Sequence, residues 1–149
     1  MDISSILDKK NIMLDMQSKQ KSDAFMELAQ CFKKNNIITD INGYVNDVLK
    51  REAEFSTGIG YGIAIPHAKS KYVKTTAIAV GKLAHNIVYD SIDNEPVRLL
   101  FMIAVPENSN DAHLKILNKL ARKFMDENFR KNILAAKNED LIFEALRIF

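Results

Sequence analysis

The chain has 149 residues, 47% of them hydrophobic, and its 21 basic and 19 acidic side chains give a formal net charge of +2. A chain of this length favours a single domain, residues 1–149, that buries about two-thirds of the surface its unfolded form exposes. The near-neutral charge argues against a nucleic-acid-binding protein with a clustered basic face, and the single cysteine, Cys31, excludes an intramolecular disulfide.

The start of the chain and its longest apolar run indicate where the protein resides. Met1-Asp2-Ile3 has neither the basic start nor the apolar core of a secretory signal. The longest apolar run, Leu99 to Val105, is far shorter than the ~20 residues that span a bilayer. These features predict a soluble protein of the reducing cytoplasm.

Two amphipathic helices are predicted in the first third of the chain, after a short strand at Ile12 to Leu14. The first helix runs from about Ser22 to Lys34, and the second has an even clearer repeat of apolar residues at helical spacing. The apolar positions are Phe25, Leu28, Ala29 and Phe32 in the first helix, and Ile41, Tyr44, Val45, Val48 and Leu49 in the second.

A sheet is predicted in the middle of the chain. Ile63 to Ile65 is a short strand, and the β-branched and alanine-rich stretch from Thr75 to Leu83 is another. The continuous apolar run from Leu99 to Val105 suits a strand that is covered on both faces. Asp93 to Pro96 has the composition of a turn between strands.

Three helices are predicted to close the chain, and the order of the elements then defines the fold class. They are Asp111 to Asp126, about Glu127 to Ala136, and Glu139 to the C-terminus. The sequence therefore predicts an α+β fold of three layers (α/β/α), in which a small mixed β-sheet has helices packed on both faces.

One histidine stands at the end of an unusual segment. The segment has three closely spaced glycines and reads Ser56-Thr57-Gly58-Ile59-Gly60-Tyr61-Gly62-Ile63-Ala64-Ile65-Pro66-His67. Glycines allow backbone to approach a ligand closely, and Pro66 fixes φ just before the imidazole. His67 is therefore a candidate site residue held in a defined position. The alternative is an ordinary surface histidine in a loop.

His113 is a second candidate because of its place in a predicted helix. Asn110 and Asp111 are good N-cap residues, so His113 falls in the first turn, where free N–H groups attract anions. This position predicts an anion clamp, and the open alternative is that His113 only covers the helix end. The packed face of this helix is predicted to consist of Leu114, Leu117, Leu120, Ala121 and Phe124.

Basic side chains supply further candidates. Arg51 ends the second predicted helix, where arginine commonly complements the helix dipole, but its planar fork also suits a pair of phosphoryl oxygens. Lys69, Lys71 and Lys74 form either a solvated strand edge or a patch for an acidic partner or phosphate. His85, near a predicted turn, is interpreted as structural.

Several kinds of chemistry are excluded by what the sequence lacks. His67, His85 and His113 have no HExxH or CxxC element nearby, so no metal site is predicted. Cys31 is interpreted as an ordinary, partly buried thiol, since no phosphate-cradling loop follows it. The glycine segment has Ile63 where a nucleotide fingerprint needs its third glycine, so no nucleotide cofactor is predicted.

Four segments together resemble a known family. In chain order they are Arg51-Glu52, then Ser56-Thr57-Gly58-Ile59-Gly60, then Gly62-Ile63-Ala64-Ile65-Pro66-His67-Ala68-Lys69, and then Asp111-Ala112-His113-Leu114. In this combination the chain resembles enzyme IIA of the fructose–mannitol family of the bacterial phosphoenolpyruvate:sugar phosphotransferase system (PTS). The resemblance covers nearly the whole chain and implies a single PTS EIIA type-2 domain.

The resemblance also implies a role for each candidate residue. His67 is the phosphorylatable histidine, and Arg51 and His113 flank the phosphoryl group. Thr57 is a weaker phosphoryl-binding candidate, as are the backbone amides at Gly58 and Gly60. A neutral imidazole with one nitrogen held by a hydrogen bond can accept and pass on the group without a metal or cofactor.

Partners are implied as well. The resemblance implies a phosphotransferase component, a protein-histidine phosphoryl carrier whose donor is HPr and whose acceptor is a cysteine of enzyme IIB in a fructose-like pathway. It implies no nucleic acid, and contact with the membrane only indirectly through enzyme IIC. The chain ends at Phe149 with no appended enzyme IIB, so these partners are expected to be separate chains. The expected docking surface contains Ile59, Tyr61, Ile63 and the lysines.

Two other functions stay open from the sequence. One is a regulatory, nitrogen-type enzyme IIA paralogue that acts by phosphorylation-dependent protein binding. The other is a plain binding module whose glycine segment holds an anion without transferring it.

Overall fold

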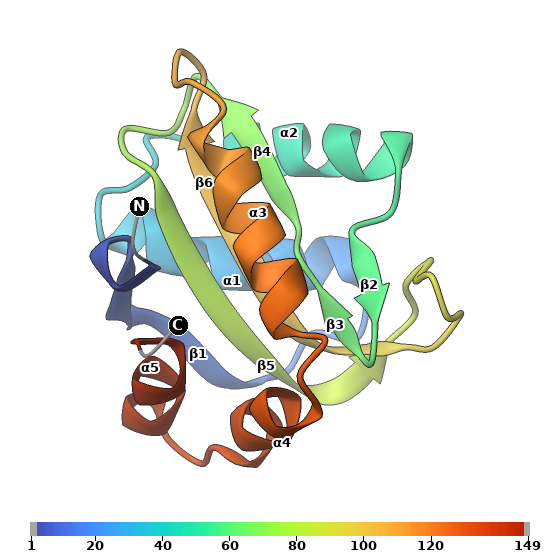
Figure 1. Ribbon diagram of the computed structural model, residues 1–149. Coiled ribbons are helices and arrows are strands. Elements are labelled where there is room, and N and C mark those ends of the chain that lie inside the picture. Colours follow the sequence, from blue (N-terminus) through green and yellow to red (C-terminus); the bar gives the residue numbers. More distant parts are fainter. Residues whose placement is uncertain (1–2, 148–149) are drawn as a thin grey trace.

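The computed structural model describes residues 3–147, in which helices cover both faces of one mixed sheet (Figure 1). The strands are β1 (Leu7–Met16), β2 (Gly58–Gly60), β3 (Ile63–Ala64), β4 (His67–Ser70), β5 (Ala77–Ile87) and β6 (Val97–Pro106). The helices are α1 (Lys21–Lys34), α2 (Ile41–Glu54), α3 (Ala112–Lys123), α4 (Glu127–Ala135) and α5 (Glu139–Arg147), preceded by a 3-10 turn at Ile3–Ser5. The expected α+β fold of three layers is confirmed.

The sheet has the strand order β1-β5-β6-β3-β2, and β4 also pairs with β6. β5 runs antiparallel to β6, whereas β1 is parallel to β5. β3 and β4 are both parallel to β6, with Ile63 opposite Leu99 and His67 opposite Ile103. The two short strands therefore follow each other along the same side of β6, interrupted only at Ile65 and Pro66.

β6 separates two apolar cores. Leu100, Met102 and Ala104 belong to the core under α1 and α2. The residues that alternate with them (Leu99, Phe101, Ile103 and Val105) belong to the core under α3, α4 and α5. All seven are at most 1% exposed, so the expectation of a strand covered on both faces is confirmed. Figure 1 shows α3 in front of the sheet and α1 behind it.

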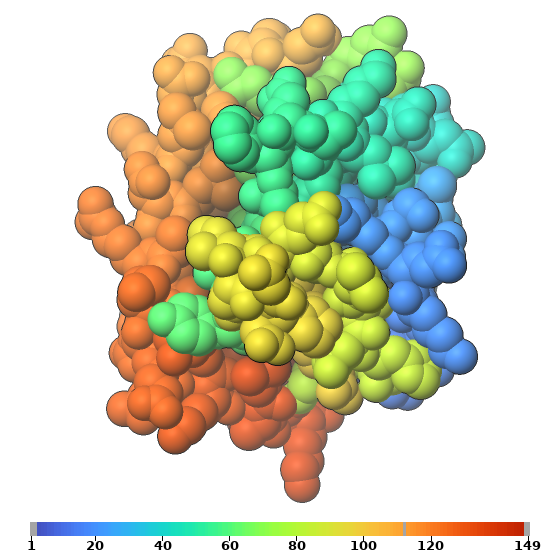
Figure 2. All heavy atoms as spheres, turned by 90° about the vertical axis from the view of Figure 1, so that its right-hand side faces the viewer, coloured from blue at the N-terminus to red at the C-terminus, as the bar shows by residue number. Residues whose placement is uncertain are grey.

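The segment between β5 and β6 closes one end of the molecule. Tyr89 is buried, and Ile92 N donates to Gly58 O at 3.2 Å, so this segment packs on β2. Figure 2 shows it in yellow at the centre of that face, between α2 in teal and the orange helices. The expected turn at Asp93 to Pro96 lies within it, where Glu95 N donates to Asp93 Oδ1 at 3.1 Å.

Several strand expectations need correction. The first strand covers Leu7–Met16 and not only Ile12 to Leu14, because exposed charged side chains on this edge strand interrupt its apolar pattern. β5 continues to Ile87, so His85 is an exposed residue within a strand and does not lie near a turn. β2 and β4 were not predicted, because two segments this short carry no readable alternation.

The helices agree with expectation except in their details. α2 continues to Glu54, so Arg51 lies in its last turn and does not end it. Asp111 is the N-cap residue of α3, but its side chain makes no capping hydrogen bond. The last residues of the helix expected to run to the C-terminus, 148–149, lie outside the described residues.

The packed face of α3 was only partly predicted. Leu117, Leu120 and Phe124 face the core as expected, but Leu114 is 48% exposed and Ala121 is also exposed. Ile116, 3% exposed, takes the expected place of Leu114. Among residues 3–147, no helix is both long and apolar enough to cross a bilayer.

Candidate active site

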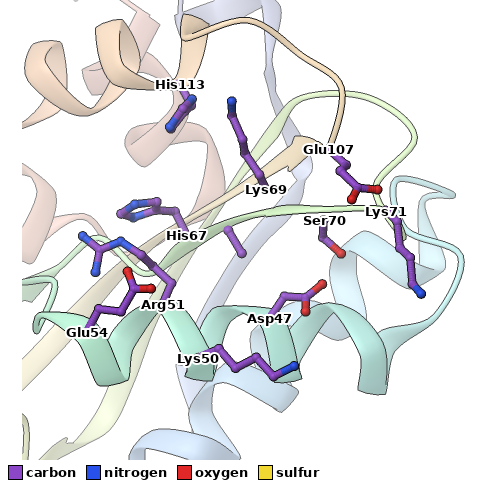
Figure 3. Close-up of a pocket in the computed structure, with 11 residues that line it drawn as sticks. Asp47, Lys50, Arg51, Glu54, His67, Lys69, Ser70, Lys71, Glu107 and His113 are labelled. Atoms are coloured by element: carbon purple, nitrogen blue, oxygen red, sulfur yellow. The ribbon is translucent and has the colours of Figure 1, made fainter.

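The candidate site is a cavity of about 560 Å³ at the edge of the sheet. Among the described residues, β4 pairs with β6 and with no other strand, so its second edge is open at this point. Arg51 enters it from α2, His67 from β4 and His113 from α3. Figure 3 shows the guanidinium of Arg51 beside the imidazole of His67, with His113 on the other side. The fold thus brings together the three residues that the sequence singled out.

His67 is held by the interruption between β3 and β4. Ile65 N donates to Thr57 O at 3.0 Å, and Pro66 has no N–H but accepts from Ile103 N at 2.9 Å. The Ile65 carbonyl is thereby free to accept a hydrogen bond from His67 Nδ1 at 2.9 Å. A carbonyl can only accept, so Nδ1 carries the proton and the lone pair is left on Nε2.

The surroundings of His67 favour a neutral imidazole. Its side chain is 8% exposed, and burial lowers its pKa below the usual 6.5. The hydrogen bond to Ile65 and the charge of Glu52 raise the pKa, but the nearby Arg51 and His113 lower it, and the net shift is downward. At neutral pH the Nε2 lone pair is therefore available to a phosphorus atom or another electrophile.

His113 faces His67 from the first turn of α3. The two ring centroids lie 6.5 Å apart with an angle of 40° between the planes, and both rings border the same cavity. Burial and the neighbouring Lys69 lower the pKa of His113. Lys69 Nζ also donates to Ser109 O at 3.2 Å, which ties β4 to the loop before α3.

Arg51 contributes a guanidinium cation, which carries five N–H donors. Its Nη1 donates to Phe55 O at 2.9 Å, just past the end of α2. This bond anchors one arm of the guanidinium and leaves the rest of the fork for an anion beside His67 (Figure 3). Arg51 and Lys69 thus place two cations beside the two histidines, in a cavity that Asp47, Glu54 and Glu107 also line, and these cations can attract an oxyanion.

The weaker candidates have other partners. Thr57 donates to Glu52 from its backbone N at 2.8 Å and from Oγ1 at 2.7 Å. Gly58 N donates to Ser56 Oγ at 3.1 Å. Gly60 lies at the β2–β3 turn with a φ of 94°, and neither glycine lines the cavity between the histidines. Thr57 does not line that cavity either, but it lines a smaller groove that also adjoins His67 and Arg51.

Sequence reasoning missed the buried carboxylate of Glu52, which is 7% exposed. The sequence did contain a signal for it, because Tyr44, Val48 and Glu52 are spaced by four residues and share the buried face of α2. Tyr89, whose hydroxyl lies 2.8 Å from Thr57 Oγ1, had no such signal, because only the fold brings it there.

A smaller apolar groove of about 240 Å³ adjoins His67. It is lined by Ile59 and Ile65 on one side and by Leu117 and Ala121 of α3 on the other. The expectation that Ile63 is a surface residue is wrong, since it is fully buried. Tyr61 is half exposed, and its ring lies 3.8 Å from the guanidinium carbon of Arg130.

The other chemical candidates are structural. Cys31 is buried, and burial raises the pKa of its thiol, as befits an inert core cysteine. Within residues 3–147, no group of three or more His, Cys, Asp and Glu side chains is arranged to hold a metal ion.

Comparison with known proteins gives consistent matches. Residues 5–148 match the family model of the phosphoenolpyruvate-dependent sugar phosphotransferase system, EIIA 2. The chain is 40% identical over 146 residues to the PTS system fructose-specific EIIABC component of Bacillus subtilis (strain 168), covering 98% of this chain but only 23% of that protein. It is 34% identical over 145 residues to the PTS system fructose-specific EIIA component of Haloferax volcanii, covering 97% of this chain and 94% of that protein.

A solved structure agrees with this likeness. The nitrogen regulatory protein IIA-Ntr from Neisseria meningitidis aligns with a TM-score of 0.90 at 30% sequence identity, covering 97% of this chain and 98% of that one.

Proposed function

Because the chain belongs to the EIIA 2 family of the phosphoenolpyruvate-dependent sugar phosphotransferase system, we propose that it is a phosphoryl carrier in which His67 accepts a phosphoryl group from phospho-HPr and passes it to a cysteine of an enzyme IIB. The observation that carries this proposal is the meeting of His67, Arg51 and His113, from three separate elements, at one cavity.

The chemistry follows from the free nitrogen of His67. In the first step Nε2 attacks phosphorus, a bond from Nε2 to phosphorus forms, and the bond from phosphorus to the HPr histidine breaks. In the second step a cysteine thiolate of enzyme IIB attacks phosphorus, a bond from sulfur to phosphorus forms, and the bond from phosphorus to Nε2 breaks. Throughout both steps the proton stays on Nδ1, which donates it in a hydrogen bond to Ile65 O. Arg51 and His113 stabilise the charge on the transferred oxygens, which is the main task in phosphoryl transfer.

The docking surface in this proposal surrounds His67. The apolar groove of Ile59, Ile65, Leu117 and Ala121 lies on one side of the imidazole, and the charged cavity with Lys69 and Lys71 lies on the other. An apolar patch beside charged groups is typical of an interface that forms and dissociates. Lys74, which lies outside the cavity, has no part in the proposal.

The proposal includes a fructose-like sugar, one domain over residues 1–149 and a cytoplasmic location. The sugar is supported by the names of the Bacillus and Haloferax relatives. A single domain is supported by β6, which contributes to both cores. A reducing compartment suits the free, buried thiol of Cys31.

Phosphate mapping tests the central assignment. Incubation with phosphoenolpyruvate, enzyme I and HPr is expected to give one acid-labile phosphate per chain, located on His67 Nε2 by mass spectrometry and ³¹P NMR. His67→Ala should take up no phosphate, whereas His85→Ala, which alters an exposed histidine of β5, should be labelled fully. Full labelling of His67→Ala rejects the proposal.

A regulatory role is the second candidate, because a nitrogen regulatory protein shares this fold with a TM-score of 0.90. In that case His67 is phosphorylated in the same way, but its phosphorylation state changes the binding of other proteins. The two functions differ in whether an enzyme IIB takes the group from His67.

A further inference from the structure

A buried carboxylate lies directly behind the histidine site. Glu52 follows Arg51 on the last turn of α2, but Arg51 lines the cavity whereas Glu52 is 7% exposed and faces Thr57. Among the described residues Glu52 forms no ion pair. A buried carboxylate without a paired cation is costly unless hydrogen bonds compensate it, so its partners define its role.

The hydrogen bonds of Glu52 have fixed directions. Thr57 N donates to Oε1 at 2.8 Å, and Thr57 Oγ1 lies 2.9 Å from Oε1 and 2.7 Å from Oε2. The only hydroxyl hydrogen of Thr57 therefore points to the carboxylate, which can only accept. Tyr89, whose hydroxyl lies 2.8 Å from Thr57 Oγ1, must then be the donor in that bond. Burial and the charge of Glu52 raise the pKa of Tyr89, which keeps this O–H protonated.

The chain of bonds continues from Thr57 to the imidazole. Thr57 O accepts from Ile65 N at 3.0 Å, and Ile65 O accepts from His67 Nδ1 at 2.9 Å. This bond from Ile65 N is the last rung of the pairing between β2 and β3, in which Gly58 lies opposite Ala64, and it fixes the backbone at the point where the chain leaves β3. Three consecutive contacts thus connect the Glu52 carboxylate with the ring that holds the lone pair.

We infer that Glu52 is a positioning residue for His67. By fixing Thr57 at both its N–H and its hydroxyl, Glu52 holds the peptide that orients Ile65, and the Ile65 carbonyl in turn keeps the imidazole in its Nδ1–H tautomer. The inference rests on the proposed function in one respect, since it is phosphoryl transfer that gives the Nε2 lone pair its use. The tautomer itself is a property of the unmodified protein.

The test compares Glu52→Gln with Glu54→Gln. Both variants remove one negative charge from the end of α2, and Glu54 also lines the cavity beside Arg51, but it is exposed and makes no hydrogen bond to Thr57, so it controls for the loss of charge near the site. ¹H–¹⁵N correlation spectra of the ring nitrogens at pH 8 report the tautomer of His67 directly. We expect wild type and Glu54→Gln to show Nδ1–H alone and Glu52→Gln to show a mixture with Nε2–H.

The rate of phosphoryl uptake is the second measurement. Loss of the outer partner of a metal-ligating histidine typically costs about 10- to 100-fold in affinity or activity. By analogy we expect Glu52→Gln to accept phosphate from phospho-HPr about 10-fold more slowly than Glu54→Gln. A folded Glu52→Gln with the wild-type tautomer, and with no greater loss of rate than Glu54→Gln, overturns the inference.

Tyr89→Phe keeps the test decisive if Glu52→Gln does not fold. It removes the hydroxyl at the outer end of the chain of bonds but retains the ring that contacts Phe25. We expect a smaller shift of tautomer in the same direction, and an unchanged spectrum and rate would also overturn the inference. If no protein, wild type included, takes up phosphate, the proposed function fails while the tautomer comparison still decides the role of Glu52.

Discussion

An imidazole in water exchanges its proton between two nitrogens, and at His67 the Ile65 carbonyl removes this freedom. The burial that lowers the pKa of the ring then keeps it uncharged at neutral pH. The nucleophile is therefore produced by a backbone carbonyl at a strand interruption and by the burial of the ring.

Arg51 and His113 are predicted to act on the transfer and not on the fold. Loss of one preorganised donor typically costs about 10²- to 10³-fold in rate, and we expect Arg51→Gln and His113→Ala each to slow phosphorylation of His67 by this amount. Both side chains line a cavity and neither belongs to an apolar core, so the melting temperature should stay near that of the wild type.

Stopped-flow or rapid-quench kinetics with phospho-HPr, alongside calorimetry, measures the two effects separately. His85→Ala serves as the control, since this exposed histidine lies outside the cavity. A large loss of thermal stability in either variant, or transfer at the wild-type rate, would show that these residues are structural.

At the residue scale the sequence was informative where chemistry is local. His67 was recognisable from the glycines and Pro66 around it, and Arg51 and His113 from their places at helix ends and from the family resemblance. The contact between Thr57 and Tyr89 was not, because Tyr89 lies 32 residues away and reaches Thr57 only through the packing of the segment between β5 and β6.

At the scale of elements, α3 has two apolar residues, Leu114 and Ile116, either of which could lie on its buried face. Leu114 and Ile116 are both apolar, and each fits a helical repeat with Leu117, Leu120 and Phe124. Only the packing of α3 against the core that it shares with the sheet, α4 and α5 decides between them, and it buries Ile116. The same limit applies to β2 and β4, which exist because they pair with neighbours and not because of their own composition.

This difference predicts unequal effects of two similar truncations. Ile116→Ala should lower the free energy of unfolding by about 2–5 kcal/mol, because it leaves a cavity in the core. Leu114→Ala should change it by only about 0.5 kcal/mol or less, since that side chain is 48% exposed. Urea unfolding followed by circular dichroism measures both, and equal destabilisation by the two variants would contradict the register of α3.

At the scale of the whole molecule, the three site residues come from elements that no local contact brings together. Arg51 lies on a helix of one outer layer, His113 on a helix of the other, and His67 on the sheet between them. The three layers were predictable from the order of helices and strands. The pairing of β3 and β4 with the same strand, which places His67 at an open edge, was not.

The acceptor is predicted at this scale, because it is chosen by a surface and not by a pocket for sugar. We expect phosphorylated protein to transfer its phosphoryl group faster to a fructose-type enzyme IIB domain than to mannitol-type or galactitol-type domains, as timed by loss of label. The groove of Ile59, Ile65, Leu117 and Ala121 supplies the contact surface. A faster mannitol-type or galactitol-type acceptor would refute the fructose assignment, and no transfer to any domain would favour the regulatory role.

Because Arg51 and His113 lie in opposite layers, the packing of each layer on the sheet sets the distance between these two side chains. α2 packs on β4 and β6 through small side chains, Ala68 and Ala104, which lie in the same core as Val48. A bulkier residue in place of Ala104, which is fully buried, would push the helix that carries Arg51 away from β6 and widen the opening at His67. The distance between the two side chains that flank the transferred group is therefore set partly by packing inside the core.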